Sequence, residues 1–173
     1  MNRAIFLDRD GVLNYDVGYP FRTTDFRLIQ GVSKPLIKAQ KLGFKLFIVT
    51  NQSAVARGYC SVDDVEIFNS LLIKTLSNLN VNIHDIRLCP HHPDGKILEF
   101  RSLCNCRKPN PGMINDLCNA YEIDRSRSFM IGDSVSDVNA GNAAKLKKSF
   151  QVPSNTIGAL ERCIYHILHQ NSY

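Results

Sequence analysis

Residues Ala4-Ile-Phe-Leu-Asp-Arg-Asp-Gly-Val-Leu13 form the stretch that decides the fold of this chain. An apolar run of four residues ends at Asp8, and Asp10 and Gly11 follow directly. A short apolar run that is bounded by turn residues predicts a buried strand of a parallel sheet. Reactive groups of open α/β sheets gather where the strands end, so we expect both aspartates at that edge. An Asp-X-Asp sequence alone, however, is also typical of a solvated acidic turn.

The rest of the chain alternates expected helices and strands. Helices are expected at 31–43, 61–78, 111–121, 136–144 and 157–168. Further strands are expected at 44–49, 81–88, 128–131 and 149–152. The helical segments carry apolar residues three and four positions apart, as in Val65, Phe68 and Leu72. This order predicts a three-layer, Rossmann-like α/β fold around a central, mainly parallel sheet.

Length and composition place the chain among ordinary globular proteins. Its 173 residues suit one domain over 1–173, and no repeat or linker divides them. No apolar run approaches the roughly 18 residues that a membrane helix needs. Met1-Asn2-Arg3 runs directly into the first strand and leaves no room for a signal peptide. We therefore predict a cytoplasmic protein without a membrane anchor.

The charge distribution limits the class of partner. The net charge is +5, but the basic residues are scattered apart from Lys145, Lys147 and Lys148. Nucleic-acid-binding proteins instead show a basic helix or arm with interleaved aromatic residues. We expect no nucleic acid and no membrane partner, and we predict a monomer that binds a small anionic molecule.

Polar residues follow or precede several of the other expected elements. They are Thr50 with Asn51, Lys108, and Asp133 with Asp137. Each has a structural alternative: Thr50 fits a turn cap, Lys108 a solvated surface lysine, and Asp133 a helix cap. Their joint occurrence in this order is what favours a catalytic site.

Together these residues supply the chemistry of phosphoryl transfer from a monoester. Asp8 can attack phosphorus and form an aspartyl-phosphate, while Asp10 moves the proton. Thr50 and Lys108 can hold the phosphoryl oxygens, where negative charge spreads in the transition state. Asp8, the backbone carbonyl of Asp10 and Asp133 offer the oxygen ligands that Mg²⁺ prefers.

A second cluster lies in the loop at 88–108. Cys89-Pro-His91-His92-Pro is followed by Cys104-Asn-Cys106, and these paired ligands suit tetrahedral zinc. Four protein ligands leave no open position, so the zinc would be structural and would brace the loop. Incidental buried cysteines or a disulfide are the alternatives, although a cytoplasmic compartment disfavours the disulfide. Spacing alone does not decide between His91 and His92.

These motifs resemble the haloacid-dehalogenase-like (HAD-like) phosphatase superfamily. The resemblance rests on Asp8-Arg-Asp-Gly-Val12, Thr50-Asn51 after a hydrophobic strand, Lys108, and Gly132-Asp-Ser-Val-Ser-Asp137. It implies a HAD-like fold without a large cap domain, Asp8 as nucleophile and Asp10 as acid/base. It also implies a Mg²⁺ site at Asp8, Asp10 and Asp133, with Asp137 supporting it. The family pattern favours His91, with Cys89, Cys104 and Cys106, as the Zn²⁺ ligands.

The stretches Cys89-Pro-His-His-Pro93 and Cys104-Asn-Cys-Arg-Lys-Pro-Asn-Pro-Gly-Met113 are similar to the branch that acts on heptose bisphosphates. The similarity implies a sugar bisphosphate substrate and a role in heptose synthesis for lipopolysaccharide core or another surface glycan. It implies substrate contacts at Asp16, Val17, Gly18, Tyr19, Thr50, Asn51, Gln52, Ser53, Arg107, Lys108 and Ser134. Ser134 stands where some members have a lysine, which leaves the preferred anomer of the sugar open.

Two other kinds of function remain open: a histidinol-phosphate phosphatase or another small-molecule phosphomonoesterase, and a protein without catalytic activity. Histidinol-phosphate phosphatases share the aspartates, the magnesium and the cysteine cluster, and Gly18-Tyr19 only modestly favours the heptose branch. A catalytically silent, zinc-braced interaction module is the second alternative. The complete set of Asp8, Asp10, Thr50, Lys108 and Asp133 disfavours it, because a silent protein would be free to lose any of them.

Overall fold

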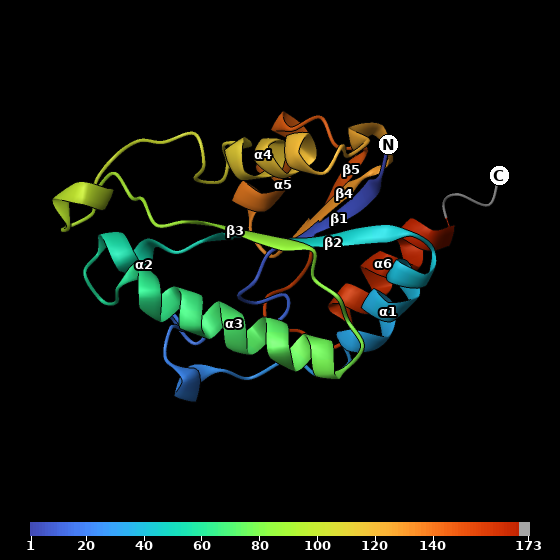
Figure 1. The fold of residues 1–173 in the computed structure, drawn as a ribbon, viewed down its shortest axis with the longest axis horizontal. Coiled ribbons are helices and arrows are strands. Elements are labelled where there is room, and N and C mark those ends of the chain that lie inside the picture. The colour runs from blue at the N-terminus through green and yellow to red at the C-terminus, as the bar shows by residue number, and fades with distance from the viewer. Residues whose placement is uncertain (170–173) are drawn as a thin grey trace.

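The computed structural model describes residues 1–169, and its strands and helices alternate along most of the chain (Figure 1). The strands are β1 (Arg3–Leu7), β2 (Phe44–Asn51), β3 (Asp85–Cys89), β4 (Phe129–Gly132) and β5 (Lys148–Gln151). The helices are α1 (Ser33–Lys41), α2 (Ser53–Ala56), α3 (Val62–Asn78), α4 (Gly112–Ala120), α5 (Val135–Ala143) and α6 (Ala159–His169). Within residues 1–169, no helix combines the length and the apolar character needed to cross a bilayer.

The strands form one sheet in the order β3-β2-β1-β4-β5, and each neighbouring pair is parallel. The register aligns Leu7, the last residue of β1, with Ile48 of β2 and Ile131 of β4. The chain moves outward from β1 to β3 on one side and from β4 to β5 on the other. The strand order therefore reverses between β1 and β4, which is where open α/β sheets place their ligand crevice.

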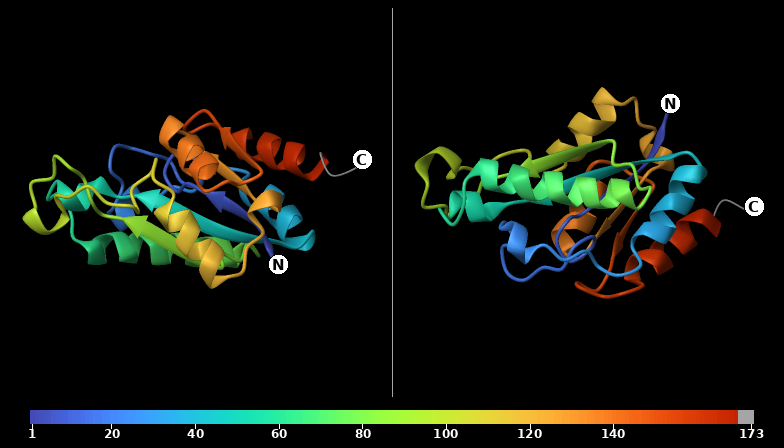
Figure 2. Two further views of the ribbon diagram at one scale, coloured as in Figure 1. Left: turned by 90° about the horizontal axis from the view of Figure 1, so that it is seen from above. Right: turned by 60° about the horizontal axis from the view of Figure 1, so that its bottom comes forward.

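Helices cover both faces of this sheet, as Figures 1 and 2 show: α1, α3 and α6 lie on one face, and α4 and α5 lie on the other. The side chains of β1 alternate accordingly. Ile5 and Leu7 belong to the core under α1, α3 and α6, whereas Phe6 belongs to the core under α4 and α5. Burial on both faces explains why the strands are continuous apolar runs in the sequence. The predicted three-layer fold is confirmed, and no separate cap is formed within residues 1–169.

Some expected boundaries are wrong. β2 continues through Thr50 and Asn51, beyond the predicted end at residue 49. The strand expected at 81–88 begins only at Asp85. Val81 and Ile83 belong to the connection before this strand, and their side chains are buried in the core. Helix α2 was not predicted, since four residues are too few to show a helical period.

Capping residues fix the starts of two helices. Ser61 and Asp64 form the predicted capping box of α3, with reciprocal side-chain to backbone hydrogen bonds. Helix α5 has a second capping box, made by Ser134 and Asp137. The helix therefore begins at Val135, one residue before the predicted start.

Candidate active site

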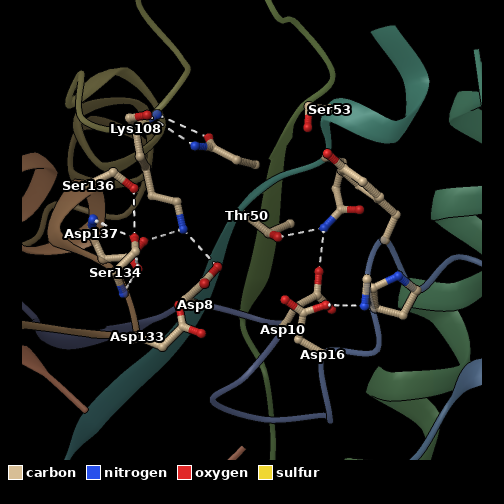
Figure 3. Close-up of a pocket in the computed structure, with 15 residues that line it drawn as sticks. Asp8, Asp10, Asp16, Thr50, Ser53, Lys108, Asp133, Ser134, Ser136 and Asp137 are labelled. Atoms are coloured by element: carbon tan, nitrogen blue, oxygen red, sulfur yellow. Dashed lines mark hydrogen bonds and ion pairs between the residues drawn. The ribbon is translucent and has the colours of Figure 1, made fainter. Parts of the chain in front are cut away.

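A cavity of about 320 Å³ opens at the carboxyl ends of β1, β2 and β4 (Figure 3). Most of the predicted site residues line it. They are Asp8, Asp10, Asp16, Gly18, Tyr19, Thr50, Asn51, Gln52, Ser53, Lys108, Asp133 and Ser134. Pro20, Ser136 and Asp137 also line it, whereas the predicted contacts Val17 and Arg107 are not among its lining residues. The structure thus gathers residues that lie more than 120 positions apart in sequence, as Asp8 and Asp133 do.

Lys108 lines the cavity, and its ammonium lies between two carboxylates (Figure 3). Its Nζ lies 2.7 Å from Oδ1 of Asp8 and 2.6 Å from Oδ1 of Asp137. It also donates a hydrogen bond to the Val49 carbonyl at 2.8 Å. Lys108 is 4% exposed, so it is a buried cation and not the solvated surface lysine of the alternative interpretation.

Burial and neighbouring charges act in opposite directions on this group. Burial disfavours the charged form of Lys108, but the Asp8 and Asp137 carboxylates outweigh it and raise the pKa of the ammonium. Burial raises the pKa of Asp8 to about 7; Lys108 opposes this rise and Asp137 adds to it. The pKa of Asp8 stays raised in the presence of Lys108, because this one ammonium is shared by two buried carboxylates. A further cation beside Asp8 would favour its ionised form.

The carboxylates at this site fit a divalent cation. Asp8, Asp133 and Asp137 each offer one ligand oxygen, and the three atoms lie within 4.8 Å of one another. Burial also raises the pKa of Asp133. Hard cations such as Mg²⁺ take carboxylate oxygens and relieve this concentration of negative charge. Two of these residues, Asp8 and Asp133, are predicted magnesium ligands, and Asp137 is the third carboxylate of the group. Asp10 is absent from this group of side chains because its predicted ligand atom is the backbone carbonyl.

The side chain of Asp10 is held by four hydrogen bonds. Its Oδ1 accepts from Nε of Arg9 and Nδ2 of Asn14, both at 2.9 Å. Its Oδ2 accepts from Nη2 of Arg9 and Nε2 of Gln52, also at 2.9 Å. The same Gln52 nitrogen lies 2.8 Å from the Thr50 hydroxyl. Gln52, predicted as a substrate contact, therefore also links Asp10 to Thr50.

Sequence reasoning gave Arg9 no role, yet it is the largest fully buried side chain of the described residues. The sequence did contain a sign of its burial, because this charged residue lies within a run of expected strand and turn residues. This sign could not be interpreted, because the partners that bury the residue lie elsewhere in the chain.

The loop after β1 closes one side of the cavity. The Asp16 side chain accepts a hydrogen bond from the Gly18 backbone at 2.8 Å, which shapes the turn before Tyr19. The Tyr19 ring packs edge-on against Tyr59, with centroids 5.4 Å apart. Val17 is 56% exposed. The loop thus adds an aromatic side chain to the lining of the cavity, and Tyr59 packs against that side chain without lining the cavity itself.

The cysteine loop at 88–108 brings its predicted ligands together. The Sγ of Cys106 lies 3.1 Å from that of Cys89, 3.3 Å from that of Cys104 and 3.4 Å from Nδ1 of His91. All four ligand atoms lie within 4.8 Å of one another. Four ligands around tetrahedral zinc are about 3.5–4 Å apart, so this donor set fits Zn²⁺ after a slight outward movement of its atoms. Within residues 1–169 these cysteines are free thiols and form no disulfide.

The second histidine of the motif lies outside this cluster. His92 Nε2 is 3.3 Å from Nη2 of Arg57, and its Nδ1 accepts from the Asp94 backbone at 3.1 Å. His91 is therefore the histidine whose ring nitrogen meets the sulfur atoms. The same loop carries Arg107, whose Nη1 donates to the His91 carbonyl at 3.1 Å.

Comparison with known proteins supports the resemblance to HAD-like phosphatases. Residues 105–154 match a family model described as HAD-hydrolase-like. A D-glycero-beta-D-manno-heptose-1,7-bisphosphate 7-phosphatase of Haemophilus influenzae is 43% identical over 152 residues, covering 88% of this chain and 82% of the relative. A protein of the same name from Rhodopseudomonas palustris is 44% identical over 141 residues, covering 82% of this chain and 78% of the relative.

A solved structure extends the likeness to the fold. It is a D,D-heptose 1,7-bisphosphate phosphatase from B. bronchiseptica, complexed with magnesium and phosphate. The two chains superpose with a TM-score of 0.82 at 25% identity, over 97% of this chain and 99% of the other. With this fold, and with 43–44% identity across most of two curated relatives, the chain belongs to the HAD-like phosphatase family, in the branch of the heptose-1,7-bisphosphate 7-phosphatases.

Proposed function

We propose that this protein is a magnesium-dependent phosphatase that removes the 7-phosphate of D-glycero-D-manno-heptose 1,7-bisphosphate. The observation that carries the proposal is that Asp8, Asp10, Thr50, Lys108 and Asp133 all line the same cavity. Relatives named for this reaction are 41–44% identical to the chain over aligned stretches of 141–152 residues, which supports the substrate. Its product would enter heptose synthesis for lipopolysaccharide or another surface glycan.

In the first half of the reaction, a carboxylate oxygen of Asp8 attacks the phosphorus of the 7-phosphate. The new P–O bond makes an aspartyl-phosphate, and the bond from phosphorus to the sugar oxygen breaks. The Asp10 carboxyl group gives its proton to that leaving oxygen. Lys108, which lies 2.7 Å from Asp8, and the Thr50 hydroxyl at the cavity wall hold the oxygens of the phosphoryl group.

In the second half, a water molecule attacks the phosphorus of the aspartyl-phosphate. Asp10, now a carboxylate, takes the proton from this water, and the P–O bond to Asp8 breaks. Inorganic phosphate leaves, Asp8 is regenerated and Asp10 again carries its proton. The same carboxyl group therefore serves as acid and then as base, so its position must suit both steps.

Mg²⁺ would be held by Asp8, Asp133 and the backbone carbonyl of Asp10, with Asp137 beside them. When bound, the cation supplies positive charge that lets an anionic nucleophile approach an anionic phosphate. Asp137 already pairs with Lys108 through Oδ1 and accepts from the Ser134 backbone and hydroxyl through Oδ2. These contacts fix its carboxylate against Lys108 and the start of α5, which supports a role in orienting the site beside the metal.

Gly11 gives a test of the metal site. Its φ is +79°, and an added Cβ would collide with Oδ2 of Asp133 and the Ser154 hydroxyl. We expect Gly11→Ala to raise the magnesium concentration needed for half-maximal activity by at least about tenfold, since second-sphere distortions cost 10–100-fold. Titration of activity with magnesium would measure it.

Gly31→Ala is the matched control. Gly31 also has a positive φ, +88°, but no heavy atom lies within 4 Å of the position that a Cβ would take. Both variants pay the backbone cost of alanine in the left-handed region, about 1–2 kcal/mol, so both should melt at lower temperature. A magnesium requirement that shifts equally in the two variants would contradict a metal site at Asp133.

Zn²⁺ would be held by Cys89, His91, Cys104 and Cys106. When bound, it cross-links the two ends of the loop at 88–108. Burial raises the pKa of the Cys89 thiol, and contact with the Cys106 sulfur adds to this rise. Without a metal, this thiol therefore stays protonated. Zinc binds cysteine as the thiolate, so zinc binding would release the Cys89 proton and would weaken as the pH falls.

The remaining predicted contacts concern the sugar and its second phosphate. Gly18, Tyr19 and Ser53 line the cavity and are proposed to contact the sugar, together with Asp16, Asn51, Gln52 and Ser134, which also line it. Arg107 and Val17 do not line the cavity in the described structure, so their contacts with substrate remain predictions. The monomeric state, the single domain over 1–173 and the cytoplasmic location also remain predictions.

A substrate panel would test the proposed function. Purified protein would be offered both anomers of the heptose 1,7-bisphosphate, histidinol phosphate and common sugar phosphates, with magnesium present. We expect the highest kcat/KM with the β anomer, because the curated relatives carry that anomer in their names. Slow turnover of both heptose anomers together with rapid turnover of histidinol phosphate would contradict the substrate assignment.

A further inference from the structure

Arg9 lies between the two proposed catalytic aspartates and has no place in the reaction described above. Its side chain is 0% exposed, although arginine is rarely buried unless it is paired. It extends from the end of β1 toward α3, where it contacts side chains of that helix and a backbone carbonyl of the loop after β1. A charged residue of this size, buried beside the site, calls for a physical reason.

The guanidinium group of Arg9 binds the Asp10 carboxylate through two parallel hydrogen bonds. Its Nε and Nη2 each lie 2.9 Å from one oxygen of the Asp10 carboxylate. Such a fork fixes the plane of a carboxylate as well as its position, because both oxygens are bound by one rigid planar group. Lysine would supply the same charge but not this geometry.

Three further contacts hold the guanidinium itself. Nη1 donates to Oδ1 of Asn69 at 2.8 Å, and Nη2 also donates to the Pro20 carbonyl at 2.9 Å. The guanidinium carbon lies 4.4 Å from the centre of the Phe68 ring. Asn69 and Phe68 belong to α3, and Pro20 belongs to the loop that lines the cavity. The group is thereby fixed from two elements that are distant in sequence.

Stability alone is a poor reason for this arrangement. Burying an ion pair removes two charges from water, and well-packed apolar side chains of similar volume are often at least as stable. What a buried fork does supply is a defined orientation of its partner. A group that must donate a proton to the sugar oxygen and later accept one from water needs that orientation.

We propose that Arg9 is a positioning residue, which holds the Asp10 carboxyl group in the plane required for proton transfer and ties it to α3 and to the cavity loop at Pro20. The inference rests on the proposed phosphatase function and adds a residue to its machinery. Arg9 contacts Asp10 and does not line the cavity that would hold the phosphate and the sugar, so it acts only through Asp10.

Leaving-group dependence separates this role from a purely structural one. The value of kcat/KM covers the steps through departure of the leaving group. An alkoxide leaving from the heptose needs a proton from Asp10, whereas 4-nitrophenolate leaves without one. We expect Arg9→Lys to lower kcat/KM for the heptose bisphosphate by about 100-fold, and for 4-nitrophenyl phosphate by less than about fivefold, since general acid catalysis contributes 10²–10⁴-fold.

Two more variants keep the test independent of folding defects. Asn69→Ala leaves the fork to Asp10 in place but loosens the guanidinium, so we expect the same selective loss at about tenfold for the heptose substrate. Arg125→Lys is the matched control: its Nη1 donates to the Ala144 carbonyl, and it does not line the cavity, so both substrates should be unaffected. Circular dichroism and thermal melting would establish that each variant is folded.

The outcomes distinguish the two proposals. Absence of heptose turnover by the unmodified protein would refute the proposed function. Normal turnover by the unmodified protein, with no loss in the variants or equal fractional losses on both substrates, would overturn the role of Arg9. A selective loss on the heptose substrate in both Arg9→Lys and Asn69→Ala would support it.

Discussion

Asp8→Asn should abolish turnover of the heptose bisphosphate while leaving the protein folded. An amide oxygen is a poor nucleophile and does not form the aspartyl-phosphate, so we expect a loss of at least about 10⁴-fold, as for other enzymes that lose a catalytic nucleophile. The fold should be kept, because asparagine is close to aspartate in size and Lys108 retains Asp137 and the Val49 carbonyl as partners. Turnover measured with magnesium, together with the melting temperature, would show both effects.

Asp116→Asn is a suitable control for this prediction. It makes the same chemical change at an exposed position on α4, away from the cavity, and should keep full activity. Mass spectrometry should verify that the amide introduced by Asp8→Asn has not reverted to a carboxylate by deamidation. Appreciable activity in verified Asp8→Asn protein would remove Asp8 from the role of nucleophile.

Cys104→Ser should have the second large effect, on metal content. The unmodified protein is expected to contain close to one zinc per chain, and a serine hydroxyl is a much weaker zinc ligand than a thiolate. Loss of one ligand should lower zinc affinity by more than about 100-fold, since even outer-sphere changes cost 10–100-fold. Elemental analysis after dialysis would give the stoichiometry of each protein.

The same variant should also weaken substrate binding. Lys108 follows Cys106 by two residues, and Arg107 donates to the carbonyl of the proposed ligand His91. A loop without its metal would hold the Lys108 ammonium less firmly beside Asp8, so KM for the heptose bisphosphate should rise. Cys60→Ser replaces a half-buried cysteine outside the cluster and should keep its zinc. Zinc content that is unchanged by Cys104→Ser would contradict the proposed metal centre.

Much of the architecture was predictable because it depends on short-range patterns. The apolar run before Asp8 and the runs at β2 and β4 indicate strands that are buried on both faces. Helix α3 could be placed to within a residue because Ser61 and Asp64 form a cap that is local in sequence. The alternation of such elements indicates a parallel sheet, because parallel neighbours need helical crossovers.

Boundaries were wrong where distant packing decides the local conformation. Val81 and Ile83 have the apolar pattern of a strand, but both are used to close the core before β3 begins. Helix α2 is a single turn, and its tertiary surroundings, including contact of the Ala56 carbonyl with the Ile97 backbone, help to define it. Local periodicity contains neither kind of information.

The sequence by itself determined the α/β class of this protein, the placement of acidic and polar residues at strand ends, and a cysteine–histidine set suited to zinc. These features follow from hydrophobic period, turn chemistry and ligand type, all of which are expressed over a few neighbouring residues. Only the tertiary structure decided that Lys108, 100 positions from Asp8, is buried between Asp8 and Asp137. It also decided that Arg9 donates hydrogen bonds both to Asp10 and to Asn69 of α3. The reason is that sheet order and strand register, and not local sequence, set which side chains meet across the chain.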